Sequence, residues 1–204
     1  RGGDSLALSV VREYLSPLVE VRERHFPMST HGDEKEQVWD SVAEEMASDV
    51  AAGRQVGFVT LGDAMLFSTW VFLLERLQGR VPMEVIPGVT SFAAIAARAV
   101  FPLAMEQQSM AVVSCTAPEA ELEQALRQHG CIVLMKVYGR FAMVRDLLAR
   151  LELLPHALLM AEASLPTEQC FRSLGEIGDD VALPYFSTIV VNKAWPSVTS
   201  REVV

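Results

Sequence analysis

Apolar residues recur at helical spacing in several parts of the chain. The clearest stripe places four apolar residues four positions apart, at Val38, Val42, Met46 and Val50, as expected for one face of an α-helix. Asp33 precedes this stripe as a capping residue, and Gly53 follows it as a helix-ending glycine. Similar patterns predict helices over residues 5–15, with Asp4 or Ser5 as the cap, and over residues 69–77, 92–100, 119–129 and 141–151.

Short, continuous apolar runs alternate with these helices. Residues 131–137 read CIVLMKV, which predicts a strand buried on most sides. Further strands are expected at residues 56–60, 83–86, 110–114, 157–161 and 186–191. The alternation predicts an α/β fold with largely parallel pairing, in two lobes that cover residues 1–104 and 105–204.

Composition narrows the class of protein. The chain has 204 residues, of which 50% are hydrophobic and 21% charged, so it can bury a core. Its net charge of −9 argues against a nucleic-acid partner. Apolar runs fall well short of the roughly 20 residues that a membrane span requires, and the chain opens on no signal-like segment. We therefore expect a cytoplasmic protein without a membrane partner.

Cysteine and histidine residues give no metal-binding pattern. Cys115, Cys131 and Cys170 lack metal-ligand spacing and are interpreted as reduced, mostly buried thiols. The histidines are also unpaired at metal spacing, so we expect no protein-bound metal. His25 and His31 flank a polar loop and are candidates for ligand contact. Because Ser114 and Cys115 lack an evident base partner, a nucleophilic hydrolase is not favoured.

Two glycine-containing breaks are the strongest signal of a site. Gly62-Asp63 follows the strand predicted at residues 56–60, and Pro-Gly-Val-Thr-Ser at residues 87–91 follows the strand predicted at residues 83–86. Small ligands bind at the carboxyl ends of strands in open α/β sheets. Glycine at 62 and 88 permits close backbone approach, while Thr90 and Ser91 add hydroxyl groups. The alternative is ordinary turn chemistry at Asp63 and helix capping at Ser68 and Ser91.

These breaks carry a family resemblance. Residues 62–69, Gly-Asp-Ala-Met-Leu-Phe-Ser-Thr, resemble the Gly-Asp-Pro-Met-Leu-Tyr-Ser-Thr stretch of the tetrapyrrole methyltransferases of cobalamin biosynthesis. Residues 86–92 are similar to that family's Ile-Pro-Gly-Val-Thr-Ser-Phe stretch. Residues 26–29, 133–137 and 184–187 are further matches. The segments at residues 65–69, 26–28 and 135–137 resemble in particular the branch that methylates C20 of precorrin-2 or cobalt-factor II. The likeness covers almost the whole chain.

Two departures accompany the resemblance. Ala64 stands where the family usually has proline. The family's first strand and its Gly-Pro-Gly-Asp-type loop have no counterpart, so we expect the sequence to be part of a longer protein. These departures leave open a non-catalytic module that binds S-adenosylmethionine. A sister methyltransferase acting at another tetrapyrrole carbon is the other alternative.

The resemblance implies a homodimeric enzyme with S-adenosylmethionine in a cleft between its lobes and S-adenosylhomocysteine as product. The N-terminal lobe is then the tetrapyrrole side and the C-terminal lobe the cofactor side. By position, the family's cofactor contacts fall on Leu61, Gly62, Asp63, Leu66, Thr90, Ser91, Met135, Ala163 and Thr188. Basic candidates for the substrate's carboxylates are Arg22, Arg24, Lys136 and Arg140.

The implied reaction needs little from the protein beyond alignment. The C20 carbon of the reduced ring is nucleophilic and the sulfonium methyl group is already activated, so holding both in line supplies several kcal/mol. The resemblance implies neither a metal nor a covalent protein intermediate. Tyr138, His31 and Glu162 are candidates for a base that removes the C20 proton, and the sequence does not choose among them.

Overall fold

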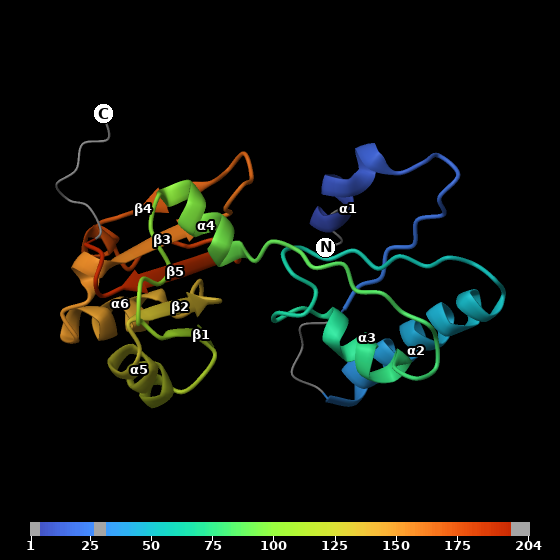
Figure 1. Ribbon diagram of the computed structural model, residues 1–204, viewed down its shortest axis with the longest axis horizontal. Helices are drawn as coiled ribbons and strands as arrows, with labels where there is room; N and C mark the ends of the chain where they lie inside the picture. Colours follow the sequence, from blue (N-terminus) through green and yellow to red (C-terminus); the bar gives the residue numbers. More distant parts are fainter. Residues whose placement is uncertain (1–4, 27–31, 197–204) are drawn as a thin grey trace. The chain divides into compact units, whose positions relative to one another are not determined.

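The computed structural model describes residues 5–26 and 32–196, and the chain forms two compact units, Arg1–Thr90 and Ser91–Val204 (Figure 1). The expected lobe boundary was near residue 104. The structure instead groups helix α4 (Ser91–Ala99) and the segment after it with the second unit. Asn192, which is fully buried in strand β5, donates a hydrogen bond of 2.7 Å to the carbonyl of Pro102. This hydrogen bond holds the segment against the sheet.

The regular elements among the described residues of the first unit are helices. They are α1 (Leu6–Val11), the 3₁₀ turn η1 (Arg12–Tyr14), α2 (Gly32–Ala51) and α3 (Trp70–Leu77). Ser5 caps α1, because its side chain accepts a hydrogen bond of 3.3 Å from the backbone N–H of Leu8. Trp39 of α2 packs against Leu73 and Leu77 of α3 in the core, and the ring of Phe26 stacks on Trp39 at 4.0 Å.

The strands predicted at residues 56–60 and 83–86 are wrong. Both segments are irregular in the structure, and the described residues of the first unit contain no β-strand. Phe58 and Val85 pack against the helical core, whereas Val59 and Ile86 are exposed. An apolar run becomes a strand only when another segment pairs with its backbone, and the sequence pattern does not identify such a partner.

The second unit contains a five-stranded sheet in the order β1-β2-β5-β3-β4. Its strands are β1 (Met110–Ser114), β2 (Cys131–Met135), β3 (Ala157–Ala161), β4 (Gln169–Phe171) and β5 (Ser187–Asn192). The α/β prediction is confirmed, but largely parallel pairing is wrong. Only β1 and β2 pair in parallel, and the other three pairs are antiparallel. Strand β4 was not predicted.

The reason for the mixed pairing is the insertion of β5. Strands β1, β2 and β3 share one direction, as expected when helices connect successive strands. Strand β5 runs in the opposite direction between β2 and β3. The alternation of helices and strands therefore predicted the direction of β1 to β3 correctly. The order of the strands across the sheet depends on where β5 is inserted.

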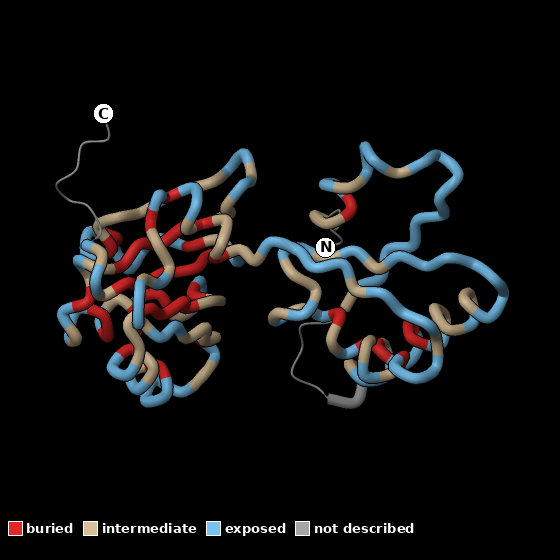
Figure 2. The backbone as a smooth tube through the Cα atoms, viewed as in Figure 1, coloured by how far each residue is buried: buried red, intermediate tan, exposed pale blue. Residues whose placement is uncertain are grey.

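Helices cover both faces of this sheet (Figure 1). Helices α5 (Glu119–Gln128) and α6 (Phe141–Arg150) pack on one face, against residues such as Leu134 and Leu159. Helix α4 packs on the opposite face, against Leu158, Met160 and Val190. The short turns η2 (Leu154–His156) and η3 (Leu174–Glu176) complete the unit. Buried residues follow the strands of this unit (Figure 2).

Candidate functional site

The two glycine-containing loops of the first unit are joined by one carboxylate. The Oδ2 atom of Asp63 accepts a hydrogen bond of 2.8 Å from the backbone N–H of Gly88, and its Oδ1 atom accepts one of 2.8 Å from the backbone N–H of Met65. The loops that the sequence placed at two separate strand ends thus form one structure. Both carboxylate oxygens bind backbone groups, which favours the turn-forming interpretation of the Asp63 side chain.

Glycine is required in each loop for a different reason. Gly62 adopts a φ of 74°, in the left-handed region that glycine enters without strain. A Cβ atom at Gly88 would lie 2.1 Å from the carbonyl oxygen of Gly62. The sequence alone indicated close approach by a ligand as the reason for both glycines. The structure shows that Gly88 allows close approach by the neighbouring loop.

Ser68 connects the first loop to helix α3. Its Oγ atom accepts a hydrogen bond of 3.2 Å from the backbone N–H of Trp70 and lies 3.2 Å from the hydroxyl of Thr60. Between Thr60 and Ser68, the backbone N–H of Leu66 donates a hydrogen bond of 3.3 Å to the carbonyl of Asp63 and closes a turn. Ala64 lies in this turn and packs against the core of the first unit.

A separate candidate surface lies across the sheet of the second unit. Met135 on β2 is directly opposite Thr188 on β5, and Thr188 is opposite Met160 on β3. Ser114 and Cys170 extend this line on the outer strands. We call these five residues the cross-sheet row. Since paired residues share a face, the row lies on the face that α4 covers.

Three of the expected cofactor residues come together here. Met135 and Thr188 belong to the cross-sheet row, and Ala163 packs against the cluster that contains Met160. Thr188 is 6% exposed, so its hydroxyl lies in largely apolar surroundings. Ser91 is the first residue of α4. The other expected contacts, Leu61, Gly62, Asp63, Leu66 and Thr90, lie in the first unit.

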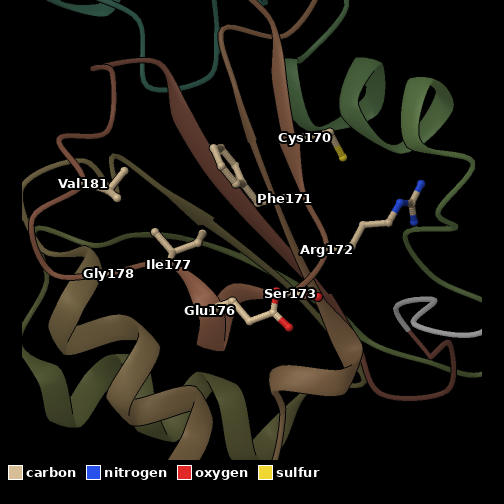
Figure 3. Close-up of a pocket in the computed structure, with 8 residues that line it drawn as sticks. All are labelled: Cys170, Phe171, Arg172, Ser173, Glu176, Ile177, Gly178 and Val181. Atoms are coloured by element: carbon tan, nitrogen blue, oxygen red, sulfur yellow. The ribbon is translucent and has the colours of Figure 1, made fainter.

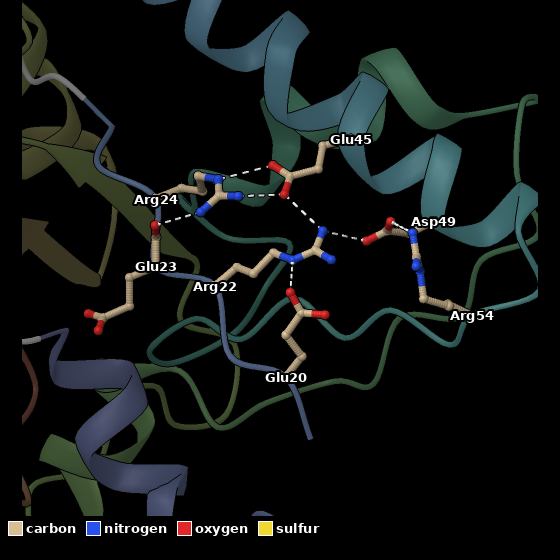
Figure 4. Close-up of polar contacts among 7 residues, drawn as sticks. All are labelled: Glu20, Arg22, Glu23, Arg24, Glu45, Asp49 and Arg54. Atoms are coloured by element: carbon tan, nitrogen blue, oxygen red, sulfur yellow. Dashed lines mark hydrogen bonds and ion pairs between the residues drawn. The ribbon is translucent and has the colours of Figure 1, made fainter. Parts of the chain in front are cut away.

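The basic candidates Arg22 and Arg24 are occupied by carboxylates within the first unit (Figure 4). Arg22 forms ion pairs with Glu20 at 2.6 Å, Glu45 at 2.9 Å and Asp49 at 2.7 Å. Arg24 donates to Glu45 at 3.0 Å. Hydrogen bonding from Arg24 lowers the pKa of Glu45, and hydrogen bonding from Arg22 lowers that of Glu20. A substrate carboxylate would have to displace these partners.

Arg140 is similarly engaged, in the second unit. Its Nη1 atom donates hydrogen bonds of 2.7 Å to the carbonyl of Cys115 and 2.6 Å to that of Ala117. The guanidinium therefore holds the segment after β1 against the start of α6. Lys136 follows β2 directly and has a φ of 59°. Of the four basic candidates, Lys136 and Arg140 lie near the cross-sheet row in the chain.

The candidate bases fall at different places. Tyr138 is 45% exposed and lies beside Tyr185, with ring centroids 5.0 Å apart. Glu162 has a φ of 52°, and its backbone N–H donates to the carbonyl of Phe186 at 2.8 Å. His31 lies outside the described residues, and His25 is exposed. Lys136 directly follows β2, and Glu162 and Ser164 follow β3; all three are non-glycine residues with positive φ, a conformation that occurs often at functional sites.

The three cysteines are free thiols. Burial raises the pKa of Cys115 to about 12 and that of Cys131 to about 11. Cys115 is therefore protonated at neutral pH and unsuited to act as a thiolate nucleophile. Within residues 5–26 and 32–196, no group of three or more His, Cys, Asp or Glu side chains is placed to hold a metal ion. In the same ranges, no helix is both long and apolar enough to cross a membrane.

An open pocket of about 550 Å³ on the second unit was not predicted from the sequence (Figure 3). It lies around strand β4 and turn η3, where apolar side chains meet a few polar ones. Its lining residues are Cys170, Phe171, Arg172, Ser173, Glu176, Ile177, Gly178 and Val181. Because β4 has only three residues and no predicted pattern, the sequence held no signal for this pocket.

Comparison with known proteins supports the resemblance found in the sequence. The family model described as tetrapyrrole (corrin/porphyrin) methylases matches residues 1–178. A cobalt-precorrin-2 C(20)-methyltransferase of Salmonella typhimurium is 65% identical, covering 96% of this chain and 82% of that protein. A precorrin-2 C(20)-methyltransferase of a Sinorhizobium species is 32% identical over 94% of this chain and 80% of that protein.

A solved structure extends the comparison to three dimensions. The uroporphyrin-III C-methyltransferase of Thermus thermophilus, complexed with S-adenosylhomocysteine, matches with a TM-score of 0.56 and 25% identity. The match covers 80% of this chain and 75% of that one. The similarity thus extends to the arrangement of helices and strands.

Proposed function

The chain belongs to the tetrapyrrole (corrin/porphyrin) methylase family, and from this premise we propose that it methylates C20 of cobalt-precorrin-2 in cobalamin biosynthesis. It is a methyltransferase of the precorrin-2 C20 type. The observation that carries the choice of substrate is the high identity to the Salmonella enzyme over nearly the whole chain. The precorrin-2 enzyme of Sinorhizobium, whose name mentions no cobalt, is less similar.

The described residues fit S-adenosylmethionine as the methyl donor. A zwitterionic ligand requires backbone polar groups held in place, and the Asp63–Gly88 hydrogen bond fixes the two loops that offer them. An adenosine group requires an apolar surface with few polar contacts, and Met135 beside the Thr188 hydroxyl provides both. When bound, the cofactor supplies a methyl group activated by its sulfonium sulfur.

We assign the cofactor contacts in two sets. In the first unit they are Leu61, Gly62, Asp63, Leu66 and Thr90. In the second unit they are Ser91, Met135, Ala163 and Thr188. The Asp63 carboxylate is already used within the loop, so in this assignment Gly62 and Asp63 bind the ligand through their backbone groups.

The chemical task of the chain is to align the reacting atoms. A carbon–carbon bond forms between C20 and the methyl group while the carbon–sulfur bond breaks, and C20 then loses its proton. Rigid positioning of the reacting atoms supplies much of such a rate enhancement. The hydrogen-bonded loops and the cross-sheet row provide fixed surfaces for this purpose. We further propose a cytoplasmic homodimer as the working form.

Ala64 no longer favours a non-catalytic module. The Asp63–Leu66 turn closes with alanine at this position, and both Asp63 contacts form. Loss of the family's usual proline therefore leaves the loop intact. The assignment to C20 rather than to another carbon rests on the similarity to C20-methyltransferases.

The test is methyl placement by the full-length natural protein. The enzyme is incubated anaerobically with ¹³C-methyl-labelled S-adenosylmethionine and either cobalt-precorrin-2 or metal-free precorrin-2, and the product is examined by NMR. We expect label on C20 and faster turnover of the cobalt compound. Label on another carbon would contradict the C20 assignment, and faster turnover of the metal-free compound would contradict the cobalt assignment. Binding of both ligands without turnover would support a non-catalytic module.

A further inference from the structure

Three aromatic side chains gather at one edge of the sheet in the second unit. Tyr138 and Tyr185 have ring centroids 5.0 Å apart, and Tyr185 and Phe186 have centroids 5.1 Å apart. All three residues are exposed, at 45%, 42% and 44% respectively. We call them the aromatic edge. Exposed apolar side chains that gather in one place indicate a binding surface more often than scattered ones do.

The sheet holds the aromatic edge in a fixed place. Tyr138 follows β2, and Phe186 immediately precedes β5. The backbone N–H of Val137 donates to the carbonyl of Ser187 at 3.4 Å, and that of Glu162 donates to the carbonyl of Phe186 at 2.8 Å. The Ser187 hydroxyl donates to the carbonyl of Pro184 at 2.6 Å. These contacts fix the backbone on both sides of the rings, so the aromatic edge is a preorganised surface.

The position of this surface relates it to the reaction. Tyr138 lies three residues beyond Met135, and Tyr185 lies three residues before Thr188, so both belong to the segments that flank the Met135–Thr188 pair of the cross-sheet row. This edge includes the carboxyl ends of β2 and β3, where α/β sheets bind ligands. Lys136 lies in the same short segment as Tyr138. An aromatic surface beside a basic residue suits a conjugated apolar ring that carries carboxylates on its rim.

We propose that Tyr138, Tyr185 and Phe186 form the surface on which the tetrapyrrole macrocycle rests, with carboxylates directed toward Lys136. This inference rests on the proposed function and assigns substrate-positioning residues to it. The ring planes of Tyr138 and Tyr185 are inclined at 50° and those of Tyr185 and Phe186 at 82°, so the rings present both faces and edges, which suits a large reduced macrocycle better than the single flat face of an adenine. Burial raises the pKa of Tyr185, with a further contribution from Tyr138, so its hydroxyl stays protonated and the surface uncharged at neutral pH.

The experiment separates substrate binding from cofactor binding. Tyr138→Ala and Tyr185→Ala are prepared in the full-length protein, with Tyr138→Phe and Tyr185→Phe to retain the rings. Met110→Ala is the matched control, because Met110 is 42% exposed and begins β1, at the opposite end of the sheet. KM for cobalt-precorrin-2 and the Kd for S-adenosylhomocysteine are measured for each variant, with circular dichroism to confirm folding.

We expect each alanine variant to raise KM for cobalt-precorrin-2 by roughly fivefold to tenfold, as the loss of one aromatic contact would. The phenylalanine variants and Met110→Ala should keep KM near the wild-type value, and the Kd for S-adenosylhomocysteine should be unchanged throughout. A raised Kd with unchanged KM would overturn the proposal in favour of adenine stacking. A variant that no longer forms a dimer but keeps its KM would overturn the proposal, because the rings would then contact the second subunit. If neither constant changes, the proposal is also overturned.

Failure of the proposed function would look different. In that case the wild-type protein would bind S-adenosylhomocysteine but turn over no precorrin-2 compound, and direct titration with cobalt-precorrin-2 would then test the aromatic edge. Weaker binding by Tyr138→Ala and Tyr185→Ala, but not by their phenylalanine counterparts, would support the macrocycle surface without turnover. Unchanged binding would overturn it. Should an alanine variant fail to fold, Tyr138→Leu and Tyr185→Leu replace it in the same measurements.

Discussion

The carboxylate of Asp63 accepts a hydrogen bond of 2.8 Å from the backbone N–H of Gly88, which lies 25 residues further along the chain. This bond connects the two loops that carry the strongest family resemblance. It also explains why glycine is needed at 88, since any Cβ there would collide with the carbonyl of Gly62. The pair of loops therefore acts as one structural element, and a change in either loop should alter the other.

Replacing Gly88 with alanine tests this dependence. The added Cβ would lie 2.1 Å from the Gly62 oxygen, so the loops must separate. We expect Gly88→Ala to destabilise the first unit by about 1–3 kcal/mol and to weaken S-adenosylhomocysteine binding about tenfold or more. Gly57→Ala is the matched control, because a Cβ at Gly57 meets nothing within 4 Å. Thermal denaturation and calorimetric titration measure both effects, and equal behaviour of the two variants would contradict the steric argument.

Restoring the family's proline at 64 should stabilise the protein. Ala64 lies at the second position of the Asp63–Leu66 turn, where the φ of proline is well suited. We expect Ala64→Pro to raise the free energy of unfolding by about 0.4–1 kcal/mol, since it restricts the unfolded chain. Ala47→Pro, inside α2, should instead cost about 3 kcal/mol. Chemical denaturation gives both values, and destabilisation by Ala64→Pro would show that the turn requires another conformation.

The hydroxyl of Thr188 should contribute to cofactor binding. Thr188 is 6% exposed and lies opposite Met135, so Thr188→Val removes a polar contact with little change in shape. We expect a loss of affinity for S-adenosylhomocysteine of roughly threefold to tenfold, as for one hydrogen bond. Thr116→Val, in the loop after β1, serves as the control. Calorimetric titration compares them, and unchanged affinity in Thr188→Val would remove Thr188 from the assigned contacts.

The Arg22–Arg24–Glu45 network should make the first unit sensitive to acid. The pKa of Glu45 is lowered from its ordinary value of 4.5, mainly by hydrogen bonding from Arg24. A lowered folded-state pKa stabilises the protein above the unfolded pKa, and this contribution is lost as pH falls through the folded value. We expect stability to fall between ~pH 5 and ~pH 3, and Glu45→Gln to flatten this decline.

Tryptophan fluorescence provides the measurement, because Trp39 and Trp70 both lie in the first unit. At neutral pH, Glu45→Gln should cost no more than about 1 kcal/mol, as is usual for an accessible ion pair. Glu75→Gln, at an exposed position on α3, should retain the wild-type pH profile. If the stability of Glu45→Gln falls at low pH as steeply as that of the wild-type protein, other carboxylates cause the pH dependence.

Thiol labelling should distinguish Cys170 from the other cysteines. Cys170 is exposed, whereas Cys115 and Cys131 are buried. Partial burial raises the pKa of the Cys170 thiol, so iodoacetamide should react slowly at neutral pH and faster as the pH rises. Mass spectrometry of the native protein should show a single adduct, and Cys170→Ser should show none. Modification of Cys115 before Cys170 would contradict the burial pattern.

Much of the local structure was predictable from the sequence. Helix α2 followed from apolar residues at four-residue spacing, and Ser5 was among the predicted caps for α1. The short apolar runs predicted β1, β2, β3 and β5. The apolar runs at residues 56–60 and 83–86 gave wrong strand predictions. Their composition is similar to that of the true strands, but the described residues contain no strand that pairs with them. The local pattern alone cannot distinguish an apolar run that pairs into a sheet from one that stays irregular.

The arrangement of the candidate site was only partly predictable. The family resemblance indicated the Gly62-Asp63 and Gly88 loops and the Met135 strand as expected cofactor contacts, which remain a proposal. It did not reveal that both carboxylate oxygens of Asp63 accept hydrogen bonds from the backbone. Nor did the sequence show that Arg22 and Arg24 are already paired with acidic residues. The charge of an arginine is visible in the sequence, whereas its partner depends on how distant segments meet.

The sequence by itself determined the helices, the direction of β1 to β3, the glycine-containing loops and the family. These features depend on interactions within a few residues, or on motifs that are read directly. The tertiary structure alone decided the insertion of β5 between β2 and β3, the Met135–Thr188 pairing and the gathering of Tyr138 with Tyr185. Each of these requires two segments far apart in the chain to become neighbours, and the packing of the folded core, rather than local preference, selects which segments meet.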